Sequence, residues 1–282
     1  MIRRLVPALL GLTAAACLAS PALAQDSEEP LPNDPNSVTI GLGGAYAPSY
    51  EGSDDYIFIP VGIAFGKLGG IGFATRGTAL YVDVIPDDPN SAFSFDVGPV
   101  ANLRLDRTSR IRDPRVRALG ELDMAIELGG WVGLKKNGLL HRYDSLGLRV
   151  AVTKDVSDTH GSTIVTPAIE YSTPLSTKTL ASLSWQAERV GDGYARTYFG
   201  VTPGGALASG LPAYTPDGGW KNWRLSLVLG QTITGDLRHP GLSIFGGISY
   251  SKMLGDFARS PIVAIAGDKD QYFATAGLAY TF

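Results

Sequence analysis

The sequence YFATAGLAYTF, from Tyr272 to Phe282, alternates between two kinds of side chain. One set is apolar with aromatic residues at both ends, and the other is small and mostly weakly polar. A repeat of two residues predicts a strand rather than a helix. This arrangement is typical of a strand with lipid on one side, a lumen on the other, and aromatics at the two interfaces. The first set is Tyr272, Ala274, Ala276, Leu278, Tyr280 and Phe282, and the second is Phe273, Thr275, Gly277, Ala279 and Thr281.

The same segment also fits the last strand of a soluble β-sandwich, because a short apolar run does not distinguish the two. Its Tyr-x-Phe ending resembles the closing strand of bacterial outer-membrane β-barrels. The choice between lipid and water therefore depends on the rest of the chain.

Residues 1–24 are predicted to be a secretory signal peptide that is cleaved after Ala24. Arg3 and Arg4 precede an apolar stretch, and Ala22-Leu23-Ala24 forms an A-x-A cleavage site. The expected mature chain has 258 of the 282 residues and lacks cysteine, because Cys17 lies in the removed segment. It loses two arginines and no acid, so its formal charge goes from -3 to -5, which argues against a nucleic-acid partner.

No apolar run after residue 24 is long enough for a membrane helix, so a membrane location requires a closed barrel. Residues 25–36, QDSEEPLPNDPN, are acidic and rich in proline, which predicts a disordered periplasmic leader. Residues 37–282 are predicted to form a single all-β domain, a transmembrane antiparallel β-barrel of about twelve strands. The strands are expected near 37–46, 56–66, 69–75, 78–85, 92–104, 120–135, 144–154, 162–172, 179–189, 221–233, 241–252 and 272–282.

The connections between these strands alternate in length. The proposed outer loops include 105–119, 190–220 and 253–271, which are the three longest connections, whereas the proposed periplasmic turns 67–68, 86–91, 136–143, 173–178 and 235–240 are all short. Outer-membrane barrels sort their loops in this way, with short turns in the periplasm and long loops outside the cell. Together with the signal peptide and the aromatic ending, this asymmetry favours the barrel over the sandwich.

Charged residues inside the predicted strands fall opposite the apolar face, so we expect them to line a polar lumen. In the second strand, Ile57, Ile59, Val61, Ile63 and Phe65 share the apolar face. The tryptophans are expected to anchor the barrel at the membrane interfaces. The lumen charges are Glu121, Asp123, Glu127, Arg149, Glu170, Glu188 and Arg224, and the tryptophans are Trp131, Trp185, Trp220 and Trp223.

Three stretches are similar to the MipA/OmpV family of outer-membrane proteins. They are GLGGAYAPSYEGSDDYIFIPV from Gly41 to Val61, YFGVTPGGALASGLPAYTPDGG from Tyr198 to Gly219, and the ending Tyr280-Thr281-Phe282. The resemblance implies a β-barrel in the outer membrane of a Gram-negative cell. One branch of the family is described as a scaffold that joins a lytic transglycosylase, a murein hydrolase, to a murein synthase. Other members are treated as antigens, adhesins or channels.

Three functions therefore remain open: a non-enzymatic scaffold of the cell envelope, a passive channel or adhesin, and an outer-membrane lipid hydrolase. No catalytic or metal-binding motif is found among the three histidines, and no cofactor is expected. The hydrolase reading depends on His160-Gly161-Ser162, since a His-x-Ser pair on a strand would share one face. Its predicted position in a hairpin loop favours a structural role.

Five arginines gather in the segment 105–119, which is expected to lie near the outer leaflet. Arginine binds phosphate in a bidentate manner, so these side chains are candidates for contact with lipopolysaccharide phosphates. A solvated charged loop is the alternative. The candidate residues are Arg107, Arg110, Arg112, Arg115 and Arg117.

Overall fold

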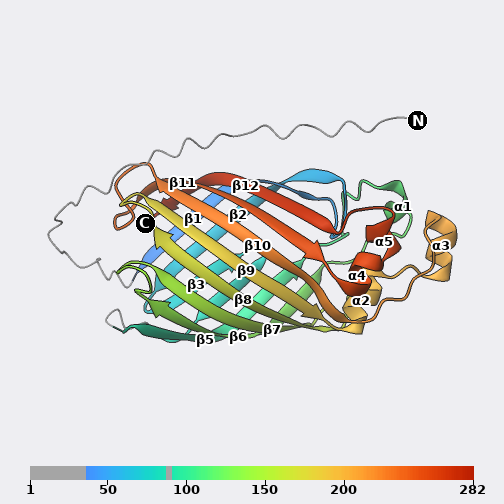
Figure 1. Cartoon of the computed structure of the whole chain (residues 1–282), viewed down its shortest axis with the longest axis horizontal. Coiled ribbons are helices and arrows are strands. Elements are labelled where there is room, and N and C mark those ends of the chain that lie inside the picture. Colours follow the sequence, from blue (N-terminus) through green and yellow to red (C-terminus); the bar gives the residue numbers. More distant parts are fainter. Residues whose placement is uncertain (1–35, 87–90) are drawn as a thin grey trace. The chain divides into compact units, whose positions relative to one another are not determined.

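The computed structural model describes residues 36–86 and 91–282, and in these residues twelve antiparallel strands form one closed barrel (Figure 1). Each strand pairs with its neighbours in sequence, and the last pairs with the first. The predicted fold class and strand number are confirmed. The strands are β1 (Ser37–Pro48), β2 (Tyr56–Leu68), β3 (Ile71–Arg76), β4 (Ala79–Asp83), β5 (Phe93–Arg104), β6 (Ala125–Asn137), β7 (Ser145–Asp155), β8 (Thr163–Pro174), β9 (Thr179–Val190), β10 (Gly219–Thr232), β11 (Gly241–Met253) and β12 (Asp270–Thr281).

The barrel closes where β12 pairs with β1, from Thr39 opposite Thr281 to Tyr46 opposite Ala274. Two glycines, Gly43 and Gly277, face each other at the centre of this seam. A Cβ on Gly277 would lie 2.4 Å from the Leu42 carbonyl oxygen and 2.6 Å from the Phe245 ring. Glycine is therefore required here for the two strands to approach while the Phe245 ring fills the lumen beside them.

The outward side chains of the wall are apolar. Leu42 on β1, Val150 on β7 and Ile248 on β11 are all exposed, as are Ile40, Leu148 and Ile244 on the same strands. A continuous apolar surface of this kind is far larger than a water-soluble monomer carries, so lipid is its natural environment. The charges predicted to line the lumen within strands do so, namely Glu127, Arg149, Glu170, Glu188 and Arg224.

Strand β2 departs from the expected orientation. Its apolar set Ile57, Ile59, Val61, Ile63 and Phe65 lies on the lumen face, because β2 pairs with β1 so that Ile59 lies opposite the buried Ala45 and Phe65 opposite the buried Thr39. The lipid face instead carries Phe58, whose ring covers Gly44. Pairing with β1, whose own outward residues are apolar, overrides the local pattern.

Two further predictions are wrong. Trp131 does not anchor the barrel at an interface: it points inward, where its Nε1 donates to the Val82 carbonyl oxygen at 2.9 Å and its ring meets Tyr81 edge-on. Glu121 and Asp123 do not line the lumen, because β6 begins only at Ala125 and both precede it. The segment before β6 is held by a hydrogen bond from the Leu122 amide to the Arg107 carbonyl oxygen.

The two ends of the barrel differ as predicted. The three longest connections, 105–124, 191–218 and 254–269, lie at one end, whereas the connections at the other end, such as 69–70, 138–144 and 175–178, are all short, so the loop-rich end is the outer end by the rule for such barrels. Short helices in these loops were not predicted. Figure 1 shows them gathered at the end opposite the C-terminus. In the described residues they are α1 (Pro114–Arg117), α2 (Asp192–Phe199), α3 (Pro203–Ser209), α4 (Gly255–Arg259) and α5 (Pro261–Ala264).

No helix in the described part of the chain is both long and apolar enough to cross a membrane. The predicted signal peptide (residues 1–24) and all but the last residue of the predicted leader (25–36) lie outside the described residues.

The orientation of the wall yields a first prediction. Val150→Arg places a charge on the lipid face near the middle of β7, which is expected to lower the free energy of unfolding by about 2–4 kcal/mol. Ser226→Arg, which puts the same side chain on the lumen face of β10, should cost much less. Urea unfolding of the barrel in phospholipid vesicles measures both. Equal losses would mean that lipid does not cover the apolar face.

Candidate functional site

The loops of the outer end pack into a lid, which comprises residues 49–55, 105–124, 191–218 and 254–269. Two buried apolar clusters hold it together. In the first, Phe199 of α2 meets Phe257 of α4 edge-on, with ring centroids 5.2 Å apart. In the second, Tyr50 and Ile111 pack with Ile262, so that loops from distant strands share one core. The lid is therefore a folded layer across the end of the barrel rather than a set of separate loops.

Beneath the lid lies a lysine with no solvent exposure. Lys221 sits at a bulge between Trp220 and Asn222, which breaks the alternation of β10. Its Nζ lies 2.7 and 2.9 Å from the two carboxylate oxygens of Glu51, 2.6 Å from Glu188 Oε2 and 3.1 Å from the Tyr194 hydroxyl. A buried ammonium needs such partners, because an unpaired buried charge is costly.

A second cation completes the group. Arg104 on β5 holds Glu127 on β6 with Nε 2.8 Å from Oε1, and its Nη1 lies 3.5 Å from Glu51 and 3.7 Å from Glu188. Asn102 donates to the other oxygen of Glu127 at 2.8 Å. We call these five charged residues the lid-base cluster: Glu51, Arg104, Glu127, Glu188 and Lys221.

The ring of Tyr194 connects the lid to this cluster. It lies 5.0 Å from the Arg104 guanidinium and 5.0 Å from the Lys221 ammonium, and its hydroxyl donates to Glu51 Oε2 at 2.8 Å. Two cations on one aromatic ring give favourable cation–π contacts. Because Tyr194 belongs to α2, the lid cannot lift there without exposing the charges beneath it.

Two carboxyl groups in the loops of this region, those of Glu51 and Asp106, have pKa values shifted in opposite directions. Burial acts to raise the pKa of Glu51, but the charges of Lys221 and Arg104 outweigh it and hold that pKa below its ordinary value. Burial and the negative charge of Glu51 raise the pKa of Asp106 to about 6. Asp106 Oδ1 nevertheless accepts a hydrogen bond from the Glu51 amide at 2.7 Å. The two adjacent carboxyls therefore favour opposite protonation states in mildly acidic solution.

The His160–Ser162 pair lies in this buried region. The Ser162 hydroxyl donates to the His160 carbonyl oxygen at 3.3 Å and accepts from the Tyr194 amide at 2.9 Å. The His160 ring accepts at Nδ1 from the Ser162 amide, and its Nε2 lies 3.3 Å from Glu127 Oε1. The hydroxyl therefore bonds to backbone groups and does not meet the imidazole, which is the contact that activates a serine nucleophile.

The five arginines proposed for phosphate contact occupy two kinds of position. Arg107 is buried and donates to the carbonyl oxygens of Tyr198 and Gly120, and Arg115 pairs with Asp113 at 2.7 Å at the start of α1. Arg110, Arg112 and Arg117 are exposed and lie together at the edge of the lid. No group of three or more potential metal ligands occurs in the described residues.

Sequence reasoning missed the lid-base cluster as a unit. Glu127 and Glu188 were expected in the lumen, but Glu51, Arg104 and Lys221 were not singled out. The members come from four strands and one loop, which only the closed barrel brings together. One signal was present: Lys221 stands between Trp220 and Trp223 at the start of an apolar strand.

The closed antiparallel ring, the apolar outer wall and the charged lumen define a transmembrane β-barrel of the outer-membrane class. The family model described as MltA-interacting protein MipA matches residues 40–282, and the chain belongs to this family. The comparison with curated proteins found no match.

Several solved structures are similar to this chain at low sequence identity. OmpT of Vibrio cholerae is 8% identical with a TM-score of 0.37, and the match covers 91% of this chain and 99% of that one. A mutant of TodX, a monoaromatic hydrocarbon channel, is 11% identical with a TM-score of 0.37, covering 88% and 90%. A bacterial polysaccharide outer membrane secretin is 11% identical with a TM-score of 0.35, covering 88% and 98%.

The lid-base cluster yields the second prediction. Lys221→Met removes the nearest cation of the half-buried Glu51 and Glu188 and leaves them only the more distant Arg104, which is expected to cost about 3 kcal/mol. Faster hydrogen–deuterium exchange in α2, together with a lower urea midpoint in vesicles, would report the loss. The control is Lys252→Met, whose half-exposed ammonium lies 4.0 Å from Asp270. Unchanged exchange in α2 of the Lys221 variant would show that the cluster does not hold the lid.

Proposed function

We propose that this protein is a non-enzymatic outer-membrane barrel that serves as a scaffold for peptidoglycan-remodelling enzymes at its periplasmic end. The family is described as MltA-interacting, which supports a murein hydrolase as one partner. We propose a murein synthase as the second partner. The buried, backbone-bonded Ser162 supports a non-enzymatic role.

The observation that carries the scaffold role is a rigid apolar turn between β6 and β7. Asp144 is buried and accepts hydrogen bonds from the amides of Leu139 at 2.6 Å and Leu140 at 2.8 Å, and from the Tyr171 hydroxyl at 2.8 Å. The His141 ring bonds to Thr173 Oγ1 at 2.7 Å, which ties the turn to β8. Leu140 is nevertheless 77% exposed. A preorganised apolar side chain costs little conformational entropy on binding, which suits a protein contact.

The third prediction tests this contact. The purified barrel in detergent should retain purified MltA on a column, and Leu140→Ser should weaken retention about tenfold, which corresponds to about 1.4 kcal/mol. Leu207→Ser is the matched control, because Leu207 is 91% exposed on α3 at the opposite end. Equal retention by the two variants would exclude the turn, and no retention by the unaltered barrel would exclude the hydrolase as a direct partner.

A passive channel is the second candidate, favoured by open space in the lumen. Val228 faces the lumen from β10, opposite Gly247, yet it is 44% exposed. Two features oppose conduction. The lid covers the outer end, and Arg76 on β3 pairs across the lumen with Glu170 on β8. The balance of these features supports a barrel that is open from the periplasm and shut at the outside.

The fourth prediction follows from this asymmetry. The intact barrel is expected to be silent in planar bilayers, and replacing residues 192–217 by a short Gly-Ser linker should produce steady conductance, because it removes α2, α3 and Tyr194 from the lid. Replacing the periplasmic turn residues 176–177 by Gly-Gly is the control and should leave the barrel silent. Steady conductance of the intact barrel would favour the channel over the scaffold.

A further inference from the structure

The barrel wall has a notch in its outer half. Strand β2 has thirteen residues, but only its last four, Phe65–Leu68, pair with β3. Strands β3 and β4 have six and five residues and turn back at Gly77 and Thr78. In the described residues, the segment Tyr56–Ile63 of β2 therefore has β1 on one side and no strand on the other. We call this gap between β2 and the β3–β4 hairpin the notch.

The free edge of β2 has features that compensate for the absence of a neighbouring strand. The Ala64 amide points towards the notch, where it donates to Thr75 Oγ1 at 2.9 Å. Backbone groups two residues apart point the same way in a strand, so those of Gly62, Pro60 and Phe58 also face the notch. Pro60 has no amide hydrogen, and the Phe58 carbonyl oxygen accepts from Arg110 Nη1 at 3.4 Å. Proline and a charged side chain are the usual protections of an unpaired edge.

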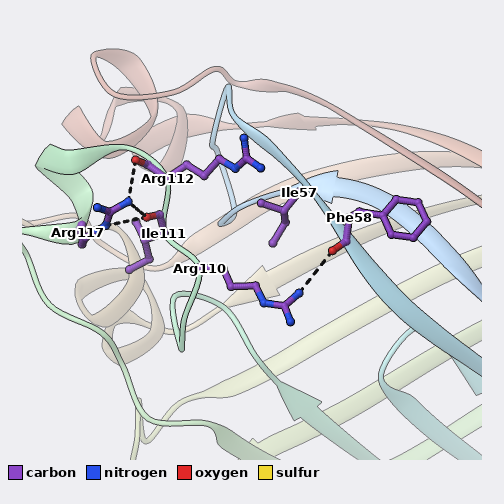
Figure 2. Close-up of a pocket in the computed structure, with 6 residues that line it drawn as sticks. All are labelled: Ile57, Phe58, Arg110, Ile111, Arg112 and Arg117. Atoms are coloured by element: carbon purple, nitrogen blue, oxygen red, sulfur yellow. Dashed lines mark hydrogen bonds between the residues drawn. The ribbon is translucent and has the colours of Figure 1, made fainter.

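A pocket of about 450 Å³ lies at the outer end of the notch (Figure 2). Ile57, Phe58 and Ile111 form its apolar part. Arg110, Arg112 and Arg117 form its polar part, and none of the three has an acidic partner among the residues described. Figure 2 shows Arg117 bonded to the carbonyl oxygens of Ile111 and Arg112, while the Arg112 side chain extends freely.

Aromatic residues fix the height of this pocket in the membrane. Tyr46 and Tyr56 stack with ring centroids 5.1 Å apart at the outer ends of β1 and β2, and Phe58 beside them is 71% exposed on the lipid face. Aromatic girdles mark the level of the lipid headgroups. Three guanidiniums without carboxylate partners thus lie at the level where lipid phosphates are found, next to an apolar surface that continues towards the hydrocarbon.

We propose that the notch binds one lipid of the outer leaflet whose headgroup carries phosphate. Arg110, Arg112 and Arg117 bind the phosphate, and an acyl chain runs down the lipid face of β2 beside the exposed Phe58 ring. Guanidinium pairs bidentately with phosphate, which an ammonium does not. The apolar part of the pocket selects a lipid over free phosphate, because it gains energy only from an acyl chain. This inference is independent of the scaffold role, which concerns the opposite end of the barrel.

The fifth prediction is a binding experiment with bisphosphorylated lipid A, measured by native mass spectrometry of the barrel in detergent. Lipid A is expected to remain bound to the unaltered protein and to bind at least tenfold more weakly to R110S/R112S/R117S. The control R189S/R196S/R259S removes three other exposed arginines from the same end and should bind normally. Chemically dephosphorylated lipid A should bind the unaltered protein at least tenfold more weakly than lipid A.

Two further variants keep the test decisive. The Arg112 side chain makes no hydrogen bond or ion pair in the described part of the chain, so Arg112→Ser preserves the fold and should still weaken lipid A binding about threefold. Phe58→Ser should weaken lipid A, while inorganic phosphate alone should not bind detectably to any variant. Equal binding of lipid A and its dephosphorylated form, or normal binding by both arginine variants, would overturn the proposal.

Discussion

The absence of water in the hydrocarbon core is the constraint on which the structure depends, because every peptide group there needs a protein partner. Closure of β1 onto β12 satisfies this requirement, and Gly43 and Gly277 make room for it. At the notch, strand pairing on one side of β2 stops short, and the sequence compensates there. Pro60 removes one amide, and Thr75 and Arg110 each supply a bond to the free edge of β2.

The charges under the lid follow from a related constraint. A lysine without solvent exposure is tolerated because Glu51, Glu188 and the ring of Tyr194 surround it. Glu51 comes from a loop and Tyr194 from a lid helix, while Glu188 and Lys221 come from adjacent strands. The wall and the lid are thus incomplete without each other: an open lid would leave carboxylates and an ammonium at the barrel mouth without their shared partners.

Periodicity was sufficient to predict the strands, the sorting of loops and the lumen position of Glu127, Arg149, Glu170 and Glu188, because a wall between lipid and water imposes alternation on every residue. Periodicity failed where strand pairing or a hydrogen bond set the direction of a side chain. Pairing with β1 turned the isoleucines of β2 inward, and the Val82 carbonyl gave Trp131 an internal partner. The lid was not predictable, since its core joins residues such as Tyr50 and Ile262 whose proximity exists only after closure.

The lumen has a charged side and an apolar side. The loop after β5 connects both sides to the lid. Charged side chains line the sector from β3 to β10, whereas Ile59, Val61 and the glycines and alanines of β1 line the other. The notch opens beside the apolar sector. Ile111 is buried in the lid core, while its neighbours Arg110 and Arg112 reach the notch. Because these residues are adjacent in one backbone, a ligand held by the two arginines would lie directly against the segment whose Ile111 packs the lid core.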